Sequence, residues 1–296
     1  MELKAPLGLP EWKIHKTSSC HGRHEKYRLE WEASGDTFFN EWQFLTESHT
    51  HGSEWYLNRS EAHRLGLVRP SDQGTIIKVG DVTHFFKRHS VMLHSARAWR
   101  PEHGFVLAMK YNHVPHGLGL WPSFWTVNSD YVWPHGGELD ILEYANGEEA
   151  KVSFHTDKNC TLDVPKMNKC MIDQELTSPA EEPNCLTNYQ QNAMGCIPKQ
   201  IKHNGEWFAK NPGVIATAWD DSRIAVYHIP EAEIPSDLQN NRPEPDTWQK
   251  WMIAYLPFEA ETCPTIAKPQ EIVLTIALCG DASGGPWRLI NRSKTE

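Results

Sequence analysis

The chain has 296 residues, enough for one large β-domain, and it contains no internal repeat and no Gly/Ser-rich linker, so we predict a single β-domain over residues 1–296. Its formal charge is −9 and its basic residues are scattered, which argues against nucleic acid or an anionic membrane as the partner. The sequence contains no apolar stretch long enough for a signal peptide or a membrane span. Either a leader has been removed or the protein is cytoplasmic, and we expect the first alternative, a secreted protein.

Strand signals are frequent along the chain and helix signals are scarce. Gly104–Tyr111 is mostly apolar and is predicted to be a strand. A cluster of aromatic residues follows, and flat rings of this kind stack on sugar faces and suit a concave binding site. Any one of the thirteen Trp residues could instead fill a core, but a cluster next to acidic residues favours a groove. The cluster consists of Trp121, Phe124, Trp125, Trp133 and Tyr144.

Residues Gly137–Glu143 read Gly-Glu-Leu-Asp-Ile-Leu-Glu and place three acids in an apolar run. Side chains alternate along a strand, so Glu138 and Asp140 share one face and Glu143 would point to the other. A β-bulge around Ile141-Leu142 would return Glu143 to the first face. The alternative is a half-solvated strand whose acids simply face water.

Three acids on one face predict glycoside hydrolysis. In a retaining mechanism one carboxylate attacks the anomeric carbon and another protonates the leaving oxygen, with the two groups about 5–5.5 Å apart. A third acid holds the nucleophile and separates the two titrations. Residues five apart span roughly 16 Å along a flat strand, so the motif also predicts a curved sheet with a groove. His155, in Ser-Phe-His-Thr, would lie on the next strand and donate a hydrogen bond to a sugar or an acid.

The stretch from about residue 157 to 206 is poorly periodic and rich in Cys, Asn, Pro and Lys. We predict an excursion from the sandwich, stapled by disulfides and lying near the cleft; a plain surface loop is the alternative. The seven cysteines contain no Cys-x-x-Cys pair, which argues against zinc, and their odd number leaves at least one thiol. Sequence proximity favours the pairs Cys185–Cys196 and Cys263–Cys279, and such disulfides fit a secreted protein.

The C-terminal part continues the strand pattern. Val214–Trp219 and Arg223–Ile229 flank Asp220-Asp221-Ser222 and are predicted to form a hairpin. Pro230–Pro245 is rich in proline and is predicted to form surface loops, and Glu271–Cys279 is predicted to be another strand. The whole pattern is that of an all-β protein with long connections.

At these motifs the chain resembles family 16 glycoside hydrolases of the fungal laminarinase and endo-1,3(4)-β-glucanase group. The resemblance covers about residues 35–285, and its Glu-x-Asp-x-x-Glu core is specific in this setting. The segments that carry it are Gly35-Asp-Thr-Phe-Phe39, Thr50-His-Gly52, Ser90-Val91, Trp121-Pro-Ser-Phe-Trp125, Trp133-Pro-His-Gly-Gly-Glu-Leu-Asp-Ile-Leu-Glu143, Phe154-His-Thr156, Asn184-Cys185, Gln191-Asn-Ala-Met-Gly-Cys196 and Cys279-Gly-Asp281.

The resemblance implies a β-jelly-roll sandwich of two curved antiparallel sheets with a concave substrate cleft. It implies Glu138 as nucleophile, Asp140 as assisting acid and Glu143 as general acid/base, with no cofactor and no catalytic metal. The expected substrate is a β-glucan polysaccharide or oligosaccharide, cut internally at 1,3- or mixed 1,3/1,4-links with retention by a monomeric enzyme. The residues expected to bind it are Trp121, Trp125, Trp133, His155 and Asn146.

Three residues depart from the family pattern and leave the linkage preference open. The family usually has Trp where this chain has Ala282, often has Cys where it has Leu118, and tends to have Arg where it has Met92. Two alternatives to a hydrolase remain. A transglycosylase would resolve the same intermediate with a sugar, and a non-catalytic sugar-binding module would not need all three acids. A calcium site built from the same acids is a further alternative, although the segment lacks the spacing that calcium loops favour.

Overall fold

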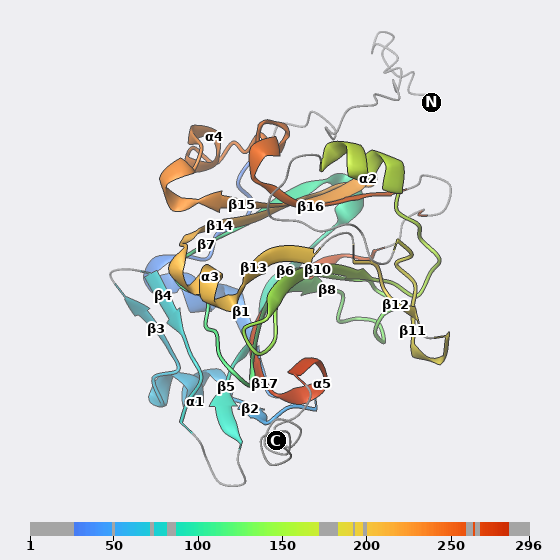
Figure 1. Cartoon of the computed structure of the whole chain (residues 1–296). Coiled ribbons are helices and arrows are strands. Elements are labelled where there is room, and N and C mark those ends of the chain that lie inside the picture. The colour runs from blue at the N-terminus through green and yellow to red at the C-terminus, as the bar shows by residue number, and fades with distance from the viewer. Residues whose placement is uncertain are drawn as a thin grey trace, which may run out of the picture.

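Two antiparallel β-sheets, packed face to face, make up the body of the computed structural model (Figure 1). The structure describes residues 27–48, 51–71, 74–81, 87–171, 183–191, 193–197, 200–258, 263 and 267–283. The larger sheet has seven strands, in the order β1 (Trp42–Leu45), β6 (Met92–Trp99), β17 (Gln270–Leu278), β8 (Leu120–Val127), β9 (Glu138–Glu143), β10 (Glu149–His155) and β13 (Gln200–Asn204). The smaller has four, in the order β16 (Met252–Pro257), β15 (Arg223–Pro230), β14 (Gly213–Trp219) and β7 (Phe105–Tyr111).

Smaller elements surround the two sheets. Three strand pairs are β2 (Glu54–Tyr56) with β5 (Arg88–Ser90), β3 (Val68–Ser71) with β4 (Gly74–Ile77), and β11 (Thr187–Asn188) with β12 (Ala193–Met194). The helices are short: α1 (Arg59–Arg64), α2 (Val164–Cys170), α3 (Gly205–Lys210), α4 (Ser236–Gln239) and α5 (Gly280–Ser283). The 3₁₀ helices are η1 (Gly35–Glu41), η3 (Pro101–His103), η4 (Tyr189–Gln191), η5 (Glu231–Glu233), η6 (Pro245–Thr247) and η7 (Gln249–Trp251). None of the helices in the described ranges is long and apolar enough to cross a membrane.

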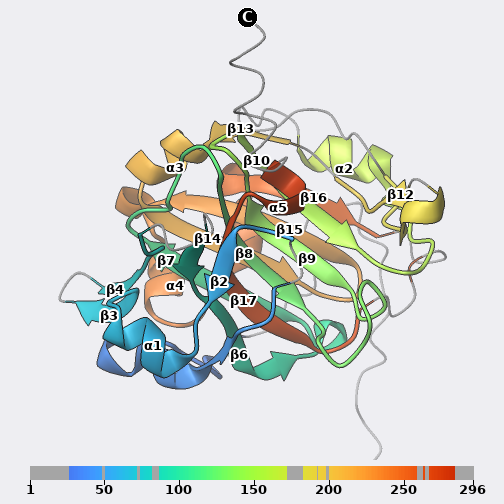
Figure 2. The same ribbon diagram turned by 90° about the horizontal axis from the view of Figure 1, so that it is seen from below.

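The core lies between the sheets because alternate residues of each strand point into that space. Phe154 of β10 is fully buried and meets Trp219 of β14 edge to face, with ring centroids 5.5 Å apart. Leu139 and Ile141 of β9 are also fully buried. The other face of the seven-stranded sheet therefore carries the remaining side chains of the same strands, and Figure 2 looks towards that face.

The all-β sandwich predicted from the sequence is confirmed, as are its strands. Gly104–Tyr111 corresponds to β7 and Glu271–Cys279 to β17. The predicted hairpin is formed by β14 and β15, and the Asp220 carboxylate closes its turn by accepting the N–H groups of Ser222 (2.8 Å) and Arg223 (3.1 Å). The Pro230–Pro245 segment differs from the prediction in part, because it contains short helical turns (η5 and α4) rather than loop alone.

One of the two predicted disulfides is confirmed and the other is wrong. Cys185 pairs with Cys196, whereas Cys263 pairs with Cys160 rather than with Cys279. Disulfides need Cα atoms within about 7 Å, but Cys263 precedes β17 and Cys279 follows it, and nine extended residues span roughly 30 Å. Cys279 keeps its thiol. Its N–H donates to the carbonyl of Gly119 (2.7 Å), next to Leu118, where the resembled family often has a cysteine.

Candidate active site

The predicted β-bulge lies in the middle of β9. On the β10 side, Asp140 is opposite Ser153 and Glu143 is opposite Lys151, so three steps on β9 match two on β10. On the β8 side, Asp140 pairs with Trp125 but Leu142 pairs with Phe124. The register against β8 and the register against β10 therefore both show one extra residue in β9. The extra residue restores Glu143 to the face that carries Glu138 and Asp140, away from the core.

Asp140 is the best-buried of the three acids and is held from β10. Its Oδ2 atom accepts the hydroxyl of Ser153 at 2.5 Å and lies 3.2 Å from Nε2 of His155. His155 is in turn 3.1 Å, through Nδ1, from the hydroxyl of Thr187. Because the imidazole is fixed at both nitrogens, Asp140 has a cationic partner in a set position.

Glu143 and Glu138 are each contacted by a tryptophan from the loops and strands around β9. The indole N–H of Trp121 donates to Oε1 of Glu143 at 2.6 Å, and Ser123 donates to the same oxygen at 3.3 Å. A hydrogen bond from the side chain of Trp133 reaches Glu138. The two outer acids are thus positioned by donors, and the aromatic residues predicted near them are close to them in space.

Burial and mutual repulsion raise the pKa of both outer acids. For Glu138 and for Glu143 the main cause is burial, followed by the negative charge of Asp140, while the charge of His155 acts in the opposite direction. Burial alone would lower the pKa of His155, but the hydrogen bond and charge of Asp140, together with both glutamates, raise it to about 9. At neutral pH the site therefore holds an imidazolium, and its crowded carboxyls favour keeping a proton on one glutamate.

The face next to the acids, formed by β8, β17 and β6, continues the site away from β10. The indole N–H of Trp125 donates to the hydroxyl of Thr275 at 3.1 Å, and its ring meets His94 edge to face at 6.1 Å. Nδ1 of His94 lies 3.0 Å from Oε2 of Glu271, within hydrogen-bond distance. Met92 and Val273 lie in a small apolar cluster against which Trp125 packs. The surroundings of Met92 are therefore apolar, whereas the resembled family tends to have Arg at this position.

Two aromatic residues assigned to the groove lie in the core instead. Phe124, between Ser123 and Trp125 on β8, is 4% exposed because alternation turns it inward. Tyr144 follows the bulge, is 2% exposed and stacks on Phe208 at 6.2 Å. The sequence interpretation was wrong for both.

Asn146 lies beyond β9 in a loop, at φ 58°, and its side-chain oxygen accepts the N–H of Gly119 (2.9 Å). That contact fixes the loop before β8. Its predicted role in sugar binding stays a prediction.

Several residues of the site were missed by sequence reasoning. Ser153 could have been found, because it is two residues before His155 and so shares its face. Ser123 has the same relation to Trp121 and Trp125. Thr187 carried no local signal, because it reaches His155 only through the fold of the cysteine-rich excursion. The described part of the excursion contacts His155 through Thr187, whereas Gln200–Asn204 form β13 of the larger sheet, so the predicted excursion ends too late in the sequence. Its position beside a cleft stays a prediction.

Glu138, Asp140 and His155 each offer a ligand atom within 4.8 Å of the others, the spacing of a cation site. Asp140 and His155 are already in contact through Oδ2 and Nε2. Because the pKa of His155 is raised to about 9, its ring carries a proton at neutral pH, and the cluster is arranged for proton control. A metal would have to displace that proton. The donor set therefore fits the acid chemistry better than it fits a cation.

Comparison with known proteins supports the same chemistry. The family model described as the XgeA-like catalytic domain of glycoside hydrolase family 16 matches residues 42–296. A probable glycosidase of Schizosaccharomyces pombe is 30% identical over 91% of this chain and 64% of its own length. An endo-1,3(4)-β-glucanase of Arthroderma benhamiae is 29% identical over 88% of this chain and 56% of its own length. The chain thus spans somewhat over half the length of these relatives.

Solved structures of similar fold include an elongating family 16 β-1,3-glucosyltransferase, with a TM-score of 0.73 and 25% identity over 87% of this chain and 84% of that one. The laminarinase 16A of Phanerochaete chrysosporium, solved with β-glucans in its donor and acceptor sites, has a TM-score of 0.73 and 22% identity over 88% of each chain. The second likeness shows the jelly-roll fold.

Proposed function

Because the chain belongs to glycoside hydrolase family 16, we propose that it is an endo-acting β-glucanase that cuts 1,3- or mixed 1,3/1,4-linked β-glucan with retention. The observation that carries this proposal is the β9 bulge, which brings Glu138, Asp140 and Glu143 to one face beside the imidazolium of His155. The name of the Arthroderma benhamiae relative agrees with it.

In the proposed reaction Glu138 attacks the anomeric carbon as a carboxylate. The bond to the leaving sugar breaks as Glu143 gives its proton to the leaving oxygen, and an ester to Glu138 forms. Water then attacks the same carbon and gives a proton to Glu143, which frees Glu138. Both donors to Glu143 contact Oε1, so we assign the transferred proton to Oε2. The hydrogen bond from Trp133 and the charge of His155 offset part of the rise that burial and the charge of Asp140 impose on the pKa of Glu138.

Asp140 and His155 are assigned to proton control. The charge of Asp140 raises the pKa of both glutamates, and the charge of His155 lowers both, so the pair sets the pH at which one is ionised and the other protonated. The ring of Trp133 and the face that carries Trp121 and Trp125 are assigned to sugar stacking.

Product release from a polysaccharide panel tests the proposal. Laminarin, barley mixed-linkage glucan, cellulose, agarose and xylan are incubated with the wild type, with Glu138→Ala as the blank. We expect oligosaccharides from laminarin or barley glucan only, and none from the blank. Release by Glu138→Ala at a rate close to that of the wild type would refute the assignment.

A substrate whose leaving group needs no protonation distinguishes the role of Glu143 from that of Glu138. On β-glucan, Glu143→Gln should lose about 10²–10⁴-fold in rate, the usual contribution of a general acid. On an aryl glycoside with a strongly acidic phenol it should lose much less, whereas Glu138→Ala should be inactive on both. Equal losses in kcat/KM, which reports the first step, by Glu143→Gln on the two substrates would rule it out as the acid.

Transglycosylation is the second candidate, and the likeness to the elongating glucosyltransferase favours it. A sugar would replace water in the second step, with the same residues. Product analysis by mass, with and without added acceptor oligosaccharides, separates the two reactions, because elongated products require transfer. The disulfides Cys160–Cys263 and Cys185–Cys196 support a site of action in an oxidising, extracellular environment.

A further inference from the structure

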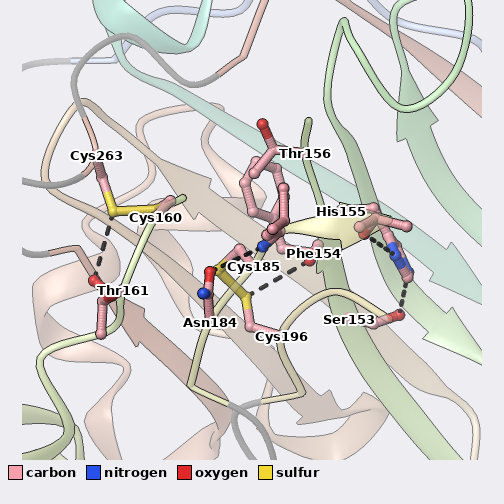
Figure 3. The surroundings of a disulfide bond; sticks show 12 residues. Ser153, Phe154, His155, Thr156, Cys160, Thr161, Asn184, Cys185, Cys196 and Cys263 are labelled. Carbon is pink, nitrogen blue, oxygen red and sulfur yellow. Dashed lines mark hydrogen bonds between the residues drawn. A yellow bond between two sulfur atoms is a disulfide. The ribbon is translucent and has the colours of Figure 1, made fainter. Parts of the chain in front are cut away.

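A disulfide-closed hairpin lies against the edge of the larger sheet at the level of the acids. It comprises residues 185–191 and 193–196, contains β11, η4 and β12, and is called the stapled hairpin below. Figure 3 shows the disulfide between Cys185 and Cys196 that closes it, beside Phe154. Cys196 exchanges two backbone hydrogen bonds with Phe154 of β10, at 2.9 and 3.0 Å. The N–H of Thr187 donates to the carbonyl of Thr156 at 2.7 Å. Both ends of the hairpin are therefore fixed to β10.

The stapled hairpin also touches the catalytic machinery. The hydroxyl of Thr187 contacts Nδ1 of His155, on the side of the ring away from Asp140. A Cβ at Gly195 would lie 2.5 Å from the same Nδ1 atom, and Gly195 has φ +87°. Only glycine fits this backbone conformation and this close approach without displacement. The hairpin is thus packed directly on His155 and has a set position relative to Glu138.

At its tip the stapled hairpin carries an exposed aromatic ring beside Trp133. Tyr189, 66% exposed, stacks on Trp133 with ring centroids 5.7 Å apart and planes 26° from parallel. The side chain of Trp133 itself forms a hydrogen bond with Glu138. The charge of Glu138 is felt at Tyr189, where it adds to burial in raising the pKa of the phenol. The ring of Tyr189 therefore lies close to the reacting end of the site.

Exposed apolar side chains concentrate where the stapled hairpin meets the loop before β9. The large hydrophobic residues that are exposed in these two segments are Tyr131, Val132, Trp133, Tyr189 and Met194. They make up five of the nine such residues in the described part of the chain. Exposed apolar surface of this kind marks a binding site when it is contiguous, and the ring stack between Trp133 and Tyr189 joins the two segments.

We propose that the stapled hairpin forms one wall of the substrate groove and that Tyr189 stacks on a sugar of the bound β-glucan, next to the sugar at Trp133. The inference rests on the proposed function, because it assigns a further part of the same site. Tyr189 would contribute to binding of chains long enough to reach it, by ring contact rather than through its hydroxyl. The disulfide would keep the wall in place at little entropic cost.

A length series tests the inference. KM and kcat are measured on laminari-oligosaccharides from the trisaccharide to the heptasaccharide for the wild type, Tyr189→Ala and Tyr189→Phe. Tyr189→Ala should raise KM about tenfold for the longer substrates, leave the shortest unchanged and keep kcat, whereas Tyr189→Phe should match the wild type. Trp251→Ala serves as the matched aromatic control, because Trp251 precedes β16 of the other sheet and contacts Glu233.

Binding provides a readout that is independent of turnover. In a Glu143→Gln background the affinity for laminariheptaose is measured by calorimetry, and adding Tyr189→Ala should weaken it about tenfold. Equal KM and affinity with and without the Tyr189 ring at every length would overturn the inference. A fall in kcat alone would overturn it too, since that would mean the hairpin acts only through His155. Failure of the wild type to cleave any β-glucan would instead count against the proposed function.

Discussion

Acidification is expected to destabilise the fold through His228, a buried imidazole on β15. Its side chain is 4% exposed, and its Nε2 lies 2.9 Å from the hydroxyl of Tyr111, which donates to the backbone oxygen of Asn211 at 2.8 Å. The rings of Trp207 and Phe208 pack around it. Burial is the main cause that lowers the pKa of His228 to about 4, and nearby His203 adds to it, while a hydrogen bond to the backbone of Asn211 opposes it.

The size of the effect follows from linkage. Because the folded-state pKa of His228 lies below the unfolded value of 6.5, the unfolded chain takes up the proton first as the pH falls. The stabilising contribution is full above pH 6.5 and is lost as the pH falls from there through about 4. Between pH 7 and pH 5 the loss is about 2 kcal/mol, and it reaches about 3 kcal/mol at pH 4.

Urea unfolding at several pH values, without reductant, measures this loss for the wild type and for His228→Phe. Phenylalanine suits the aromatic surroundings, and Tyr111 keeps its bond to Asn211 in the variant. Other titrating groups are common to both proteins, so the difference between their free energies of unfolding isolates His228. We expect that difference to fall by about 2 kcal/mol between pH 7 and pH 5. A difference that does not depend on pH would refute the reasoning.

Four further changes have defined outcomes. Asp140→Asn should slow cleavage less than loss of either glutamate and should move the kcat/KM profile to lower pH, because the charge of Asp140 raises the pKa of both. His155→Gln should move the same profile to higher pH, since the imidazolium lowers both values, and a shift of the two variants in the same direction would contradict this. Gly195→Ala should reduce kcat by displacing His155 and should also lower the unfolding midpoint, because alanine is strained at φ +87° and its Cβ would lie 2.8 Å from the backbone oxygen of Phe154; unchanged kinetics would show that the contact with His155 is tolerated. Phe154→Ala, between the sheets, should cost about 3–5 kcal/mol in urea unfolding, and a loss below about 1 kcal/mol would mean that the site collapses around the cavity.

The limits of sequence reasoning follow from how far apart the interacting residues are in the chain. Alternation along a strand is a local rule, so it could predict the bulge, the shared face of the three acids and the strands β7, β14, β15 and β17. It also applied to Phe124, whose neighbours Ser123 and Trp125 reach the site face while it turns inward. That error came from grouping aromatic residues by proximity in sequence instead of by face.

The sequence by itself predicted that Glu138, Asp140 and Glu143 share one face, because their spacing requires one extra residue in β9. The tertiary structure decided what surrounds them. Cys263 forms its disulfide with Cys160 because the long strand β17 separates it from Cys279. The sequence near these cysteines does not indicate how far apart they lie in space. Thr187 and Tyr189 reach the site because a disulfide closes their hairpin and backbone hydrogen bonds fix it to Phe154 and Thr156. Contacts of this kind depend on where whole strands lie in space, which the order of residues within one strand does not specify.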